Sequence, residues 1–161
     1  MYARSTAKKG FTLIEILIVV IILGILAAIV IPQFTNASKE AKQSALTSMV
    51  QSLRSQIALF KLQHNDYLPG CNPVSNTTFA EATFWDQMTL FSDIAGATVA
   101  AKDATHVYGP YMQSKCVNPI NDSSTVAAAA AVGVGFVYDY NAGIGSGKIW
   151  GVDATGALVN Q

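Results

Sequence analysis

The chain has 161 residues, and its ten basic side chains are balanced by ten acidic ones. This balance excludes the strongly basic surface that is typical of nucleic-acid-binding proteins, so no nucleic acid is expected as a partner. The length suits one small domain, but 51% of the residues are hydrophobic, which is high for a globular protein. The excess lies in one N-terminal segment, and the remainder has ordinary composition.

That segment runs from Phe11 to Ile31, and Pro32 follows it. As a helix it is roughly 31 Å long, enough to cross the hydrocarbon core of a bilayer, where a helix satisfies its own backbone hydrogen bonds. Glu15 is its one charged residue. An unpaired carboxylate in lipid costs on the order of 3 kcal/mol. Glu15 therefore either reaches the bilayer edge or pairs with a positive group.

The residues before this segment, Met1 to Gly10, form a polar leader that contains Arg4, Lys8 and Lys9. The leader lacks the apolar region of an ordinary secretory signal, so we expect the apolar segment to stay in the mature protein. The positive-inside rule predicts that the leader faces the cytoplasm and that everything after Pro32 is exported. Loss of the leader would leave seven basic side chains against ten acidic ones.

The helix is predicted to continue beyond Pro32 over residues 32–65 as an amphipathic segment. Its apolar stripe recurs at three- and four-residue steps: Phe34, Ala37, Ala41, Ala45, Met49, Leu53, Ile57 and Phe60. From Phe11 to Gln63 such a helix would be roughly 80 Å long. Gly24 and Pro32 are its weak points, since glycine lowers helix propensity and proline removes a backbone donor.

Residues 66–161 are predicted to form a globular α+β head. Pro69, Gly70 and Pro73 end the long helix, and a shorter helix is expected from a Thr78 N-cap, with Glu81 three residues on, to Ile94. The segment 98–113 indicates one or two short strands, and 123–131 a loop. The alternation in 132–140, followed by strands at 148–153 and 157–159, predicts an antiparallel meander.

Few residues of the head could carry chemistry, and the sequence predicts no enzyme, no catalytic residue and no cofactor. Lys148 follows a glycine-rich stretch, but Ile149 stands where a phosphate-binding loop needs Ser or Thr. His64 and His106 have no nucleophile motif nearby, and no second ligand pair accompanies Cys71 and Cys116. In an exported domain these two cysteines are predicted to form a disulfide, with two buried free thiols as the alternative.

The stretch Lys9-Gly-Phe-Thr-Leu-Ile-Glu15 resembles the prepilin N-terminus of type IV pilins and type II secretion pseudopilins. This resemblance implies a pilin fold, cleavage between Gly10 and Phe11 by prepilin peptidase, and N-methylation of Phe11. It implies that Glu15 meets the Phe11 amine of a neighbouring subunit in a filament, and that the helix near Gly24 and Pro32 can lose order on packing. An inner-membrane assembly platform, an assembly ATPase and copies of the chain itself are the implied partners.

The resemblance also implies a location: a single pass through the bacterial inner membrane, then a periplasmic or extracellular filament. The pieces Tyr108-Gly-Pro-Tyr-Met112 and Val117-Asn-Pro119 resemble type II secretion major pseudopilins. That subfamily is known for calcium near its C-terminus, but Asp122, Asp139 and Asp153 match no EF-hand spacing and the site does not map onto single residues here. No metal is therefore assigned, and calcium stays an open alternative. A type IVa pilin is the second interpretation, and a membrane-anchored binding module or enzyme the third.

Overall fold

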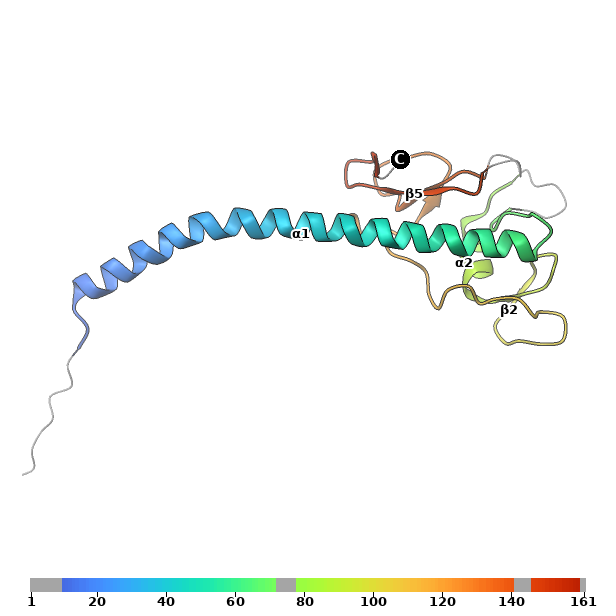
Figure 1. Ribbon diagram of the computed structural model, residues 1–161, viewed down its shortest axis with the longest axis horizontal. Helices are drawn as coiled ribbons and strands as arrows, with labels where there is room; N and C mark the ends of the chain where they lie inside the picture. The colour runs from blue at the N-terminus through green and yellow to red at the C-terminus, as the bar shows by residue number, and fades with distance from the viewer. Residues whose placement is uncertain (1–9, 72–77, 141–145, 160–161) are drawn as a thin grey trace, which may run out of the picture. The chain divides into compact units, whose positions relative to one another are not determined.

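The computed structural model describes residues 10–71, 78–140 and 146–159. These residues belong to two compact units, residues 1–40 and 41–161, which we describe separately. One helix, α1 (Leu13–Gln63), supplies residues to both (Figure 1). The helix ends at Gln63 as predicted, although it begins two residues after the expected Phe11. The leader residues Arg4, Lys8 and Lys9 lie outside the described residues.

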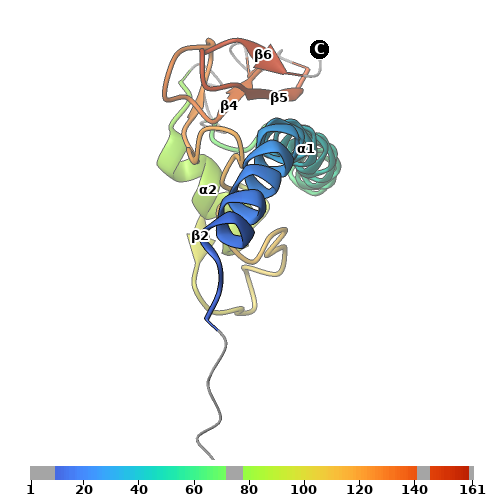
Figure 2. The ribbon, with the colours of Figure 1, turned by 90° about the vertical axis from the view of Figure 1, so that its left-hand side faces the viewer.

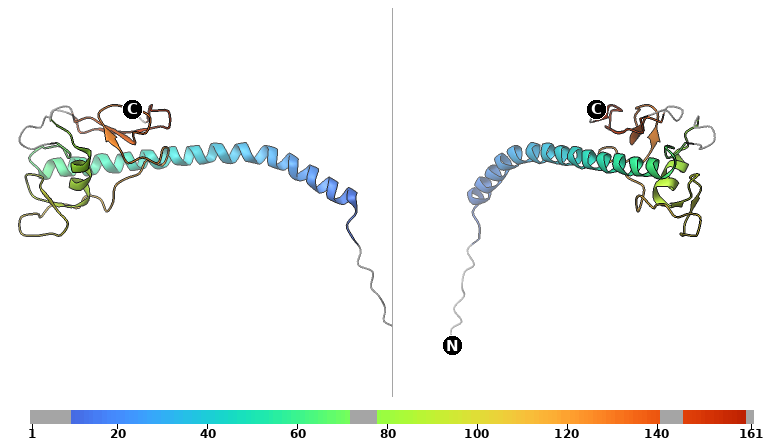
Figure 3. Two further views of the ribbon diagram at one scale, coloured as in Figure 1. Left: turned by 180° about the vertical axis from the view of Figure 1, so that it is seen from behind. Right: turned by 45° about the vertical axis from the view of Figure 1, so that its right-hand side comes forward.

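The core of the second unit is built on one face of α1. Five side chains spaced at helical intervals along that face are at most 2% exposed: Leu46, Val50, Leu53, Ile57 and Phe60. The predicted stripe is thus right at Leu53, Ile57 and Phe60. One turn or more earlier it is one residue off, because Leu46 and Val50 are buried where Ala45 and Met49 were expected to be. Within this unit, the C-terminal sheet lies on one side of α1 and the helix α2 on the other (Figures 1 and 3).

The short helix α2 spans Glu81–Thr89 and buries Phe84, Trp85 and Met88 against the same core. Its N-cap is Ala80, with no side-chain hydrogen bond, so the predicted Thr78 cap is wrong. The helix also ends five residues before the expected Ile94. Two residues after the end of α2 the chain enters the strand β1 (Phe91–Ser92), which pairs antiparallel with β2 (Thr98–Val99).

A four-stranded sheet forms the other side of the unit, in the order β3-β4-β5-β6 (Figure 2). Its strands are β3 (Val126–Ala127), β4 (Phe136–Tyr138), β5 (Ile149–Val152) and β6 (Leu158–Val159). The last three are the predicted antiparallel meander. However, β3 pairs parallel to β4, inside the segment that was expected to be a loop. The α+β fold is confirmed, with one parallel pair added.

Helix and sheet approach closely at Gly151 in the middle of β5. A Cβ atom on Gly151 would lie 2.6 Å from Cδ2 of Leu46, so only glycine leaves room for this leucine. Phe136 pairs with Gly151 and Tyr138 with Ile149, which places these residues on the face of the sheet toward α1. Val137 and Trp150, a pair between them, belong to the opposite face.

Candidate functional site: the N-terminal segment

The N-terminus of α1 is closed by a capping box made by Thr12 and Glu15. The Thr12 Oγ1 atom accepts a hydrogen bond of 3.3 Å from the Glu15 backbone N–H. In return, Glu15 Oε2 accepts one of 2.8 Å from the Thr12 backbone N–H and one of 2.7 Å from its hydroxyl. This exchange satisfies two of the N–H groups that a helix start leaves without an intrahelical partner. Glu15 thus has a partner within its own chain.

The sequence indicated that Glu15 is functional, but the only specific partner expected for its carboxylate was the Phe11 amine of another subunit. The missed signal was the Thr-x-x-Glu spacing ahead of an apolar run, which is the usual sign of a capping box. The two roles are compatible, because a carboxylate has two oxygens and several lone pairs. Oε2 takes both bonds from Thr12, and Oε1 takes none within the part of the chain that the structure describes.

The predicted cleavage site lies just ahead of this cap. Gly10 and Phe11 precede the helix in exposed chain outside any helix or strand, and Phe11 is 84% exposed. A Cβ atom on Gly10 would meet nothing within 4 Å. Both residues of the predicted cleavage site are therefore exposed, and cleavage between them remains a prediction.

The apolar side chains after Glu15 are unburied within their own unit. Those from Ile16 to Ile31 that are large and hydrophobic are 41% to 65% exposed. The helix is long and apolar enough to cross a membrane by its length and composition. Such a continuous apolar surface on an isolated chain needs a cover, either lipid or other protein.

Gly24 and Pro32 lie within this helix without interrupting it. Pro32 stands inside α1, and a Cβ atom on Gly24 would meet nothing within 4 Å. The Thr35 hydroxyl donates to the carbonyl of Ile31 over 3.2 Å, next to the proline. That these positions lose helical order on packing remains a prediction.

The cysteines do not form the predicted bond in the structure. Cys71 is buried and Cys116 half-buried, and both are free thiols. Cys71 belongs to the hydrophobic core, and Cys116 packs at the edge of it. Burial raises the pKa of both thiols, which lowers their reactivity as thiolates.

The carboxylates considered for a metal lie apart in the head. Within residues 10–71, 78–140 and 146–159, no group of three or more His, Cys, Asp or Glu side chains could hold an ion. Asp139 Oδ2 accepts from the Ser146 hydroxyl over 2.6 Å, and Asp153 Oδ1 from the Thr155 hydroxyl over 2.7 Å. These bonds lower the pKa of both carboxyl groups.

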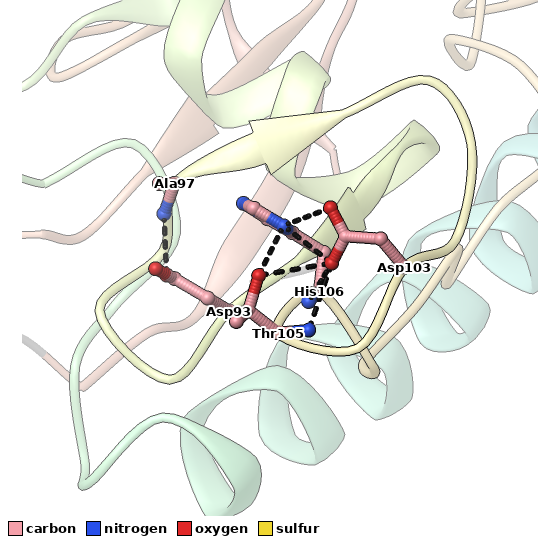
Figure 4. A network of polar contacts seen from close by, with 5 residues as sticks. All are labelled: Asp93, Ala97, Asp103, Thr105 and His106. Atoms are coloured by element: carbon pink, nitrogen blue, oxygen red, sulfur yellow. Dashed lines mark hydrogen bonds and ion pairs between the residues drawn. The ribbon is translucent and has the colours of Figure 1, made fainter.

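The two histidines also lie apart. His64 is fully buried, whereas His106 belongs to a loop network with Asp103 and Thr105 (Figure 4). Asp103 Oδ1 accepts hydrogen bonds from the backbone N–H groups of Thr105 and His106, and the His106 Nδ1 atom lies 2.9 Å from the same carboxylate. These bonds hold the pKa of Asp103 below its usual range. The network closes a loop of the head, and Asp93 closes the neighbouring turn by accepting from the Ala97 N–H.

Comparison with known proteins bears on the N-terminal segment. The family model for the prokaryotic N-terminal methylation motif matches residues 5–31, which include Gly10, Phe11 and Glu15. The N-terminal segment of the chain is therefore that of a type IV pilin-like protein. The motif ends before Leu46, the first residue of the hydrophobic core of the head.

Named relatives of this chain fall into two groups. It is 43% identical over 61 residues to type II secretion system core protein G of Dickeya chrysanthemi, which is 37% of this chain and 39% of that protein. It is 39% identical over 66 residues to the type IV narrow pilus major component PilA5 of Thermus thermophilus, 41% of this chain and 56% of that protein. A fimbrial protein of Neisseria meningitidis is 28% identical over 105 residues, 63% of this chain and 61% of that protein.

These similarities cover part of each molecule. The chain spans 38% to 45% of the length of the first four curated relatives, all core protein G. No solved structure matches the chain.

Proposed function

We propose that this chain is a structural subunit of a type IV pilus-like helical filament, in the form of a type II secretion pseudopilin. The observation that carries the proposal is the coincidence of three features at one end of the chain. These are the methylation motif over residues 5–31, an exposed Gly10–Phe11 junction, and a following helical segment, up to Ile31, whose large apolar side chains are all exposed. A membrane covers these side chains before assembly, and neighbouring copies cover them afterwards.

Processing gives this end its function. Prepilin peptidase cuts between Gly10 and Phe11, which leaves a positive α-amine at Phe11, and this amine is then methylated. In the filament the amine of one subunit pairs with Glu15 of its neighbour. A paired charge in an apolar environment fixes the register between subunits more than it adds stability. An inner-membrane platform and an assembly ATPase drive the addition of subunits.

The topology follows from the charges at the same end. Arg4, Lys8 and Lys9 hold the leader in the cytoplasm, so α1 crosses the bacterial inner membrane once and the head is outside the cytoplasm. Removal of the leader makes the mature subunit acidic. The finished filament is periplasmic for a secretion system and extracellular for a pilus.

The intact mass of the mature protein tests this proposal. The expected mass begins at Phe11 and carries one methyl group. A mass that begins at Met1, or beyond Pro32, would contradict it.

A type IVa pilin of a surface pilus is the second candidate, favoured by the similarity to the Neisseria fimbrial protein over 105 residues. Electron microscopy of the producing cells separates the two. Surface fibres at native expression support the pilin, whereas loss of an exported protein on deletion, without loss of surface fibres, supports the pseudopilin.

A further inference from the structure

A hollow on the head has an apolar wall and a basic rim. Its wall is formed by one side chain from each of three strands, Val137 of β4, Trp150 of β5 and Leu158 of β6. Val137 and Trp150 are paired, and Leu158 pairs two residues farther along β5, so the register places all three on one face of the sheet. Arg54 of α1 and Lys148, which directly precedes β5, form the rim. We call this the Trp150 hollow.

The size and lining of the Trp150 hollow suit a small molecule. Its volume is about 510 Å³, within the range of roughly 300–1,000 Å³ that small-molecule sites have. Such sites have mostly apolar walls with a few polar groups that orient the ligand. Here the polar groups are both cationic, so the lining selects a molecule that is apolar at one end and negatively charged at the other.

Arg54 is held in place at the rim. Its Nε atom donates a hydrogen bond of 2.9 Å to the carbonyl of Ile149, and its guanidinium carbon lies 6.0 Å from the centre of the Trp150 ring. A guanidinium has five N–H donors, and Nε supplies only one. The other four meet no acceptor within the part of the chain that the structure describes. A positioned guanidinium with free donors matches the two oxygens of a carboxylate.

Further positive charge lies beside Arg54. An adjoining hollow shares Arg54 and Lys148 with the first and adds Lys61. Lys61 is seven residues after Arg54, about two turns along α1, so the two basic side chains lie on the same side of the helix. Three cationic side chains therefore gather around the hollow, which strengthens its attraction for an anion.

No carboxylate of the described chain neutralises this rim. Among the described residues the one ion pair joins His106 to Asp103, and none joins a lysine or arginine to a carboxylate. The Lys148 ammonium helps to lower the pKa of Asp139, but Asp139 Oδ2 accepts hydrogen bonds from the hydroxyl and the backbone N–H of Ser146. The positive charges at the rim are therefore left for a ligand.

We propose that the Trp150 hollow binds a small organic anion, a molecule that carries a carboxylate on an apolar body. The carboxylate accepts two parallel hydrogen bonds from the free N–H groups of Arg54 and lies beside the Lys148 ammonium. The body packs against the Trp150 ring and the two aliphatic side chains of the wall. Both parts are needed, because an ion pair exposed to water contributes little by itself. The site is independent of the proposed filament function, since Gly10, Phe11 and Glu15 take no part in it.

The two tryptophans of the chain allow a direct test, because one lies in the hollow and the other in the core. Trp85 is fully buried, and its Nε1 donates to the carbonyl of Ser124 over 3.0 Å. The full-length chain in nonionic detergent, with ¹⁵N-labelled indoles, is titrated with benzoate at constant pH and ionic strength. A saturable shift of the Trp150 indole signal is expected, with the Trp85 signal unmoved. Absence of a saturable Trp150 shift would overturn the proposal.

Two related probes separate charge from apolar contact. Benzamide has the same ring without the charge, and acetate has the charge without the ring. Each should bind about tenfold more weakly than benzoate, because each loses one of the two parts of the interaction. Benzamide binding as tightly as benzoate would exclude a role for the basic rim, and equally tight acetate would exclude a role for the apolar wall. Either result overturns the proposed ligand class.

Substitutions at the rim complete the test. Arg54→Gln should abolish saturable binding of benzoate, and Lys148→Gln should weaken it about tenfold. Lys148 is exposed, so its replacement leaves the core intact, and Lys115→Gln, at an exposed lysine that lines neither hollow, should change nothing. The Trp85 signal reports in each variant that the head is folded. Benzoate binding of wild-type strength in the folded Lys148→Gln and Arg54→Gln variants would show that the site lies elsewhere.

Discussion

Thr12 and Glu15 close the start of α1 by exchanging hydrogen bonds between side chain and backbone in both directions. The carboxylate of Glu15 is thereby held at the first turn, four residues after Phe11. Its position suits the proposed meeting with a neighbour's amine, because the cap fixes the carboxylate before a partner arrives. Capping and charge are two separable properties of the one side chain.

Substitution of Glu15 separates these properties. Glutamine accepts the capping bond as well as glutamate does but carries no charge, whereas alanine loses both. We expect Glu15→Gln to keep the helix start and to abolish filament assembly, and Glu15→Ala to abolish assembly and also to fray the first turn of α1, because alanine cannot accept from the Thr12 backbone N–H. Helicity in detergent micelles and sedimentable filament yield are the measurements. Normal filaments from Glu15→Gln would show that capping alone is the role of this residue.

Two leucines on α1 offer a matched test of the core. Leu53 is fully buried, and Leu62, nine residues later on the same helix, is 81% exposed. Leu53→Ala should lower the free energy of unfolding by about 2–5 kcal/mol, since it deletes buried methyl groups and leaves a cavity. Leu62→Ala should change it by less than about 0.5 kcal/mol. Thermal denaturation of the full-length protein in detergent measures both, and similar losses for the two variants would contradict the observed burial.

The sequence predicted α1 and the C-terminal meander because both depend on local patterns. The apolar stripe of α1 recurs at the helical period up to Phe60, and Pro69 and Gly70 follow its end. Gly156 has a positive φ of 87°, which the tight turn between β5 and β6 requires and which glycine adopts easily. The helical spacing of apolar residues and the turn-forming glycines and prolines can be recognised in the sequence without knowledge of tertiary contacts.

The predictions from sequence are wrong at β3 and at the start of α2, where the local structure depends on contacts with residues distant in the sequence. Val126 and Ala127 belong to a segment with no alternation, and they become β3 only because Phe136 and Val137 lie beside them. Thr78 has the right spacing for an N-cap, yet α2 begins after Ala80, whose backbone N–H bonds the Gly70 carbonyl. Tertiary contacts override a local preference of about 1 kcal/mol. In the candidate site, the Thr12 cap could have been read from its spacing to Glu15.

Removal of divalent metal should leave the stability of the head unchanged. Asp139 and Asp153 accept hydrogen bonds from Ser146 and Thr155 in their own turns, and among the described residues no three His, Cys, Asp or Glu side chains come together to hold an ion. The expected result is the same melting temperature in excess chelator and in millimolar calcium. A ligand that binds only the native state raises the melting temperature, so a calcium-dependent increase would contradict this prediction.

His64 should make the head less stable in mild acid. It is fully buried and stacked on Phe60 with ring centres 3.8 Å apart. Its Nδ1 lies 2.8 Å from the Phe60 carbonyl, which can only accept, so Nδ1 carries the proton and Nε2, 3.0 Å from the Ser92 hydroxyl, accepts. Tyr108 and Tyr111 pack around the ring. Burial lowers the pKa of His64 from 6.5, although the nearby Asp93 opposes this shift.

The sign of the effect follows from proton uptake. Above the unfolded pKa of 6.5 the imidazole is neutral in both states, and its contribution to stability is complete. Below 6.5 the unfolded chain binds a proton that the native chain does not, so the free energy of unfolding falls as pH falls, by up to about 1.4 kcal/mol per pH unit, until the lower native pKa is reached. Melting temperatures of the full-length protein in detergent between about pH 7.5 and 5 measure the slope. His64→Gln should flatten it relative to the wild type, His106→Gln should not, and an equal slope in all three proteins would exclude His64 as its source.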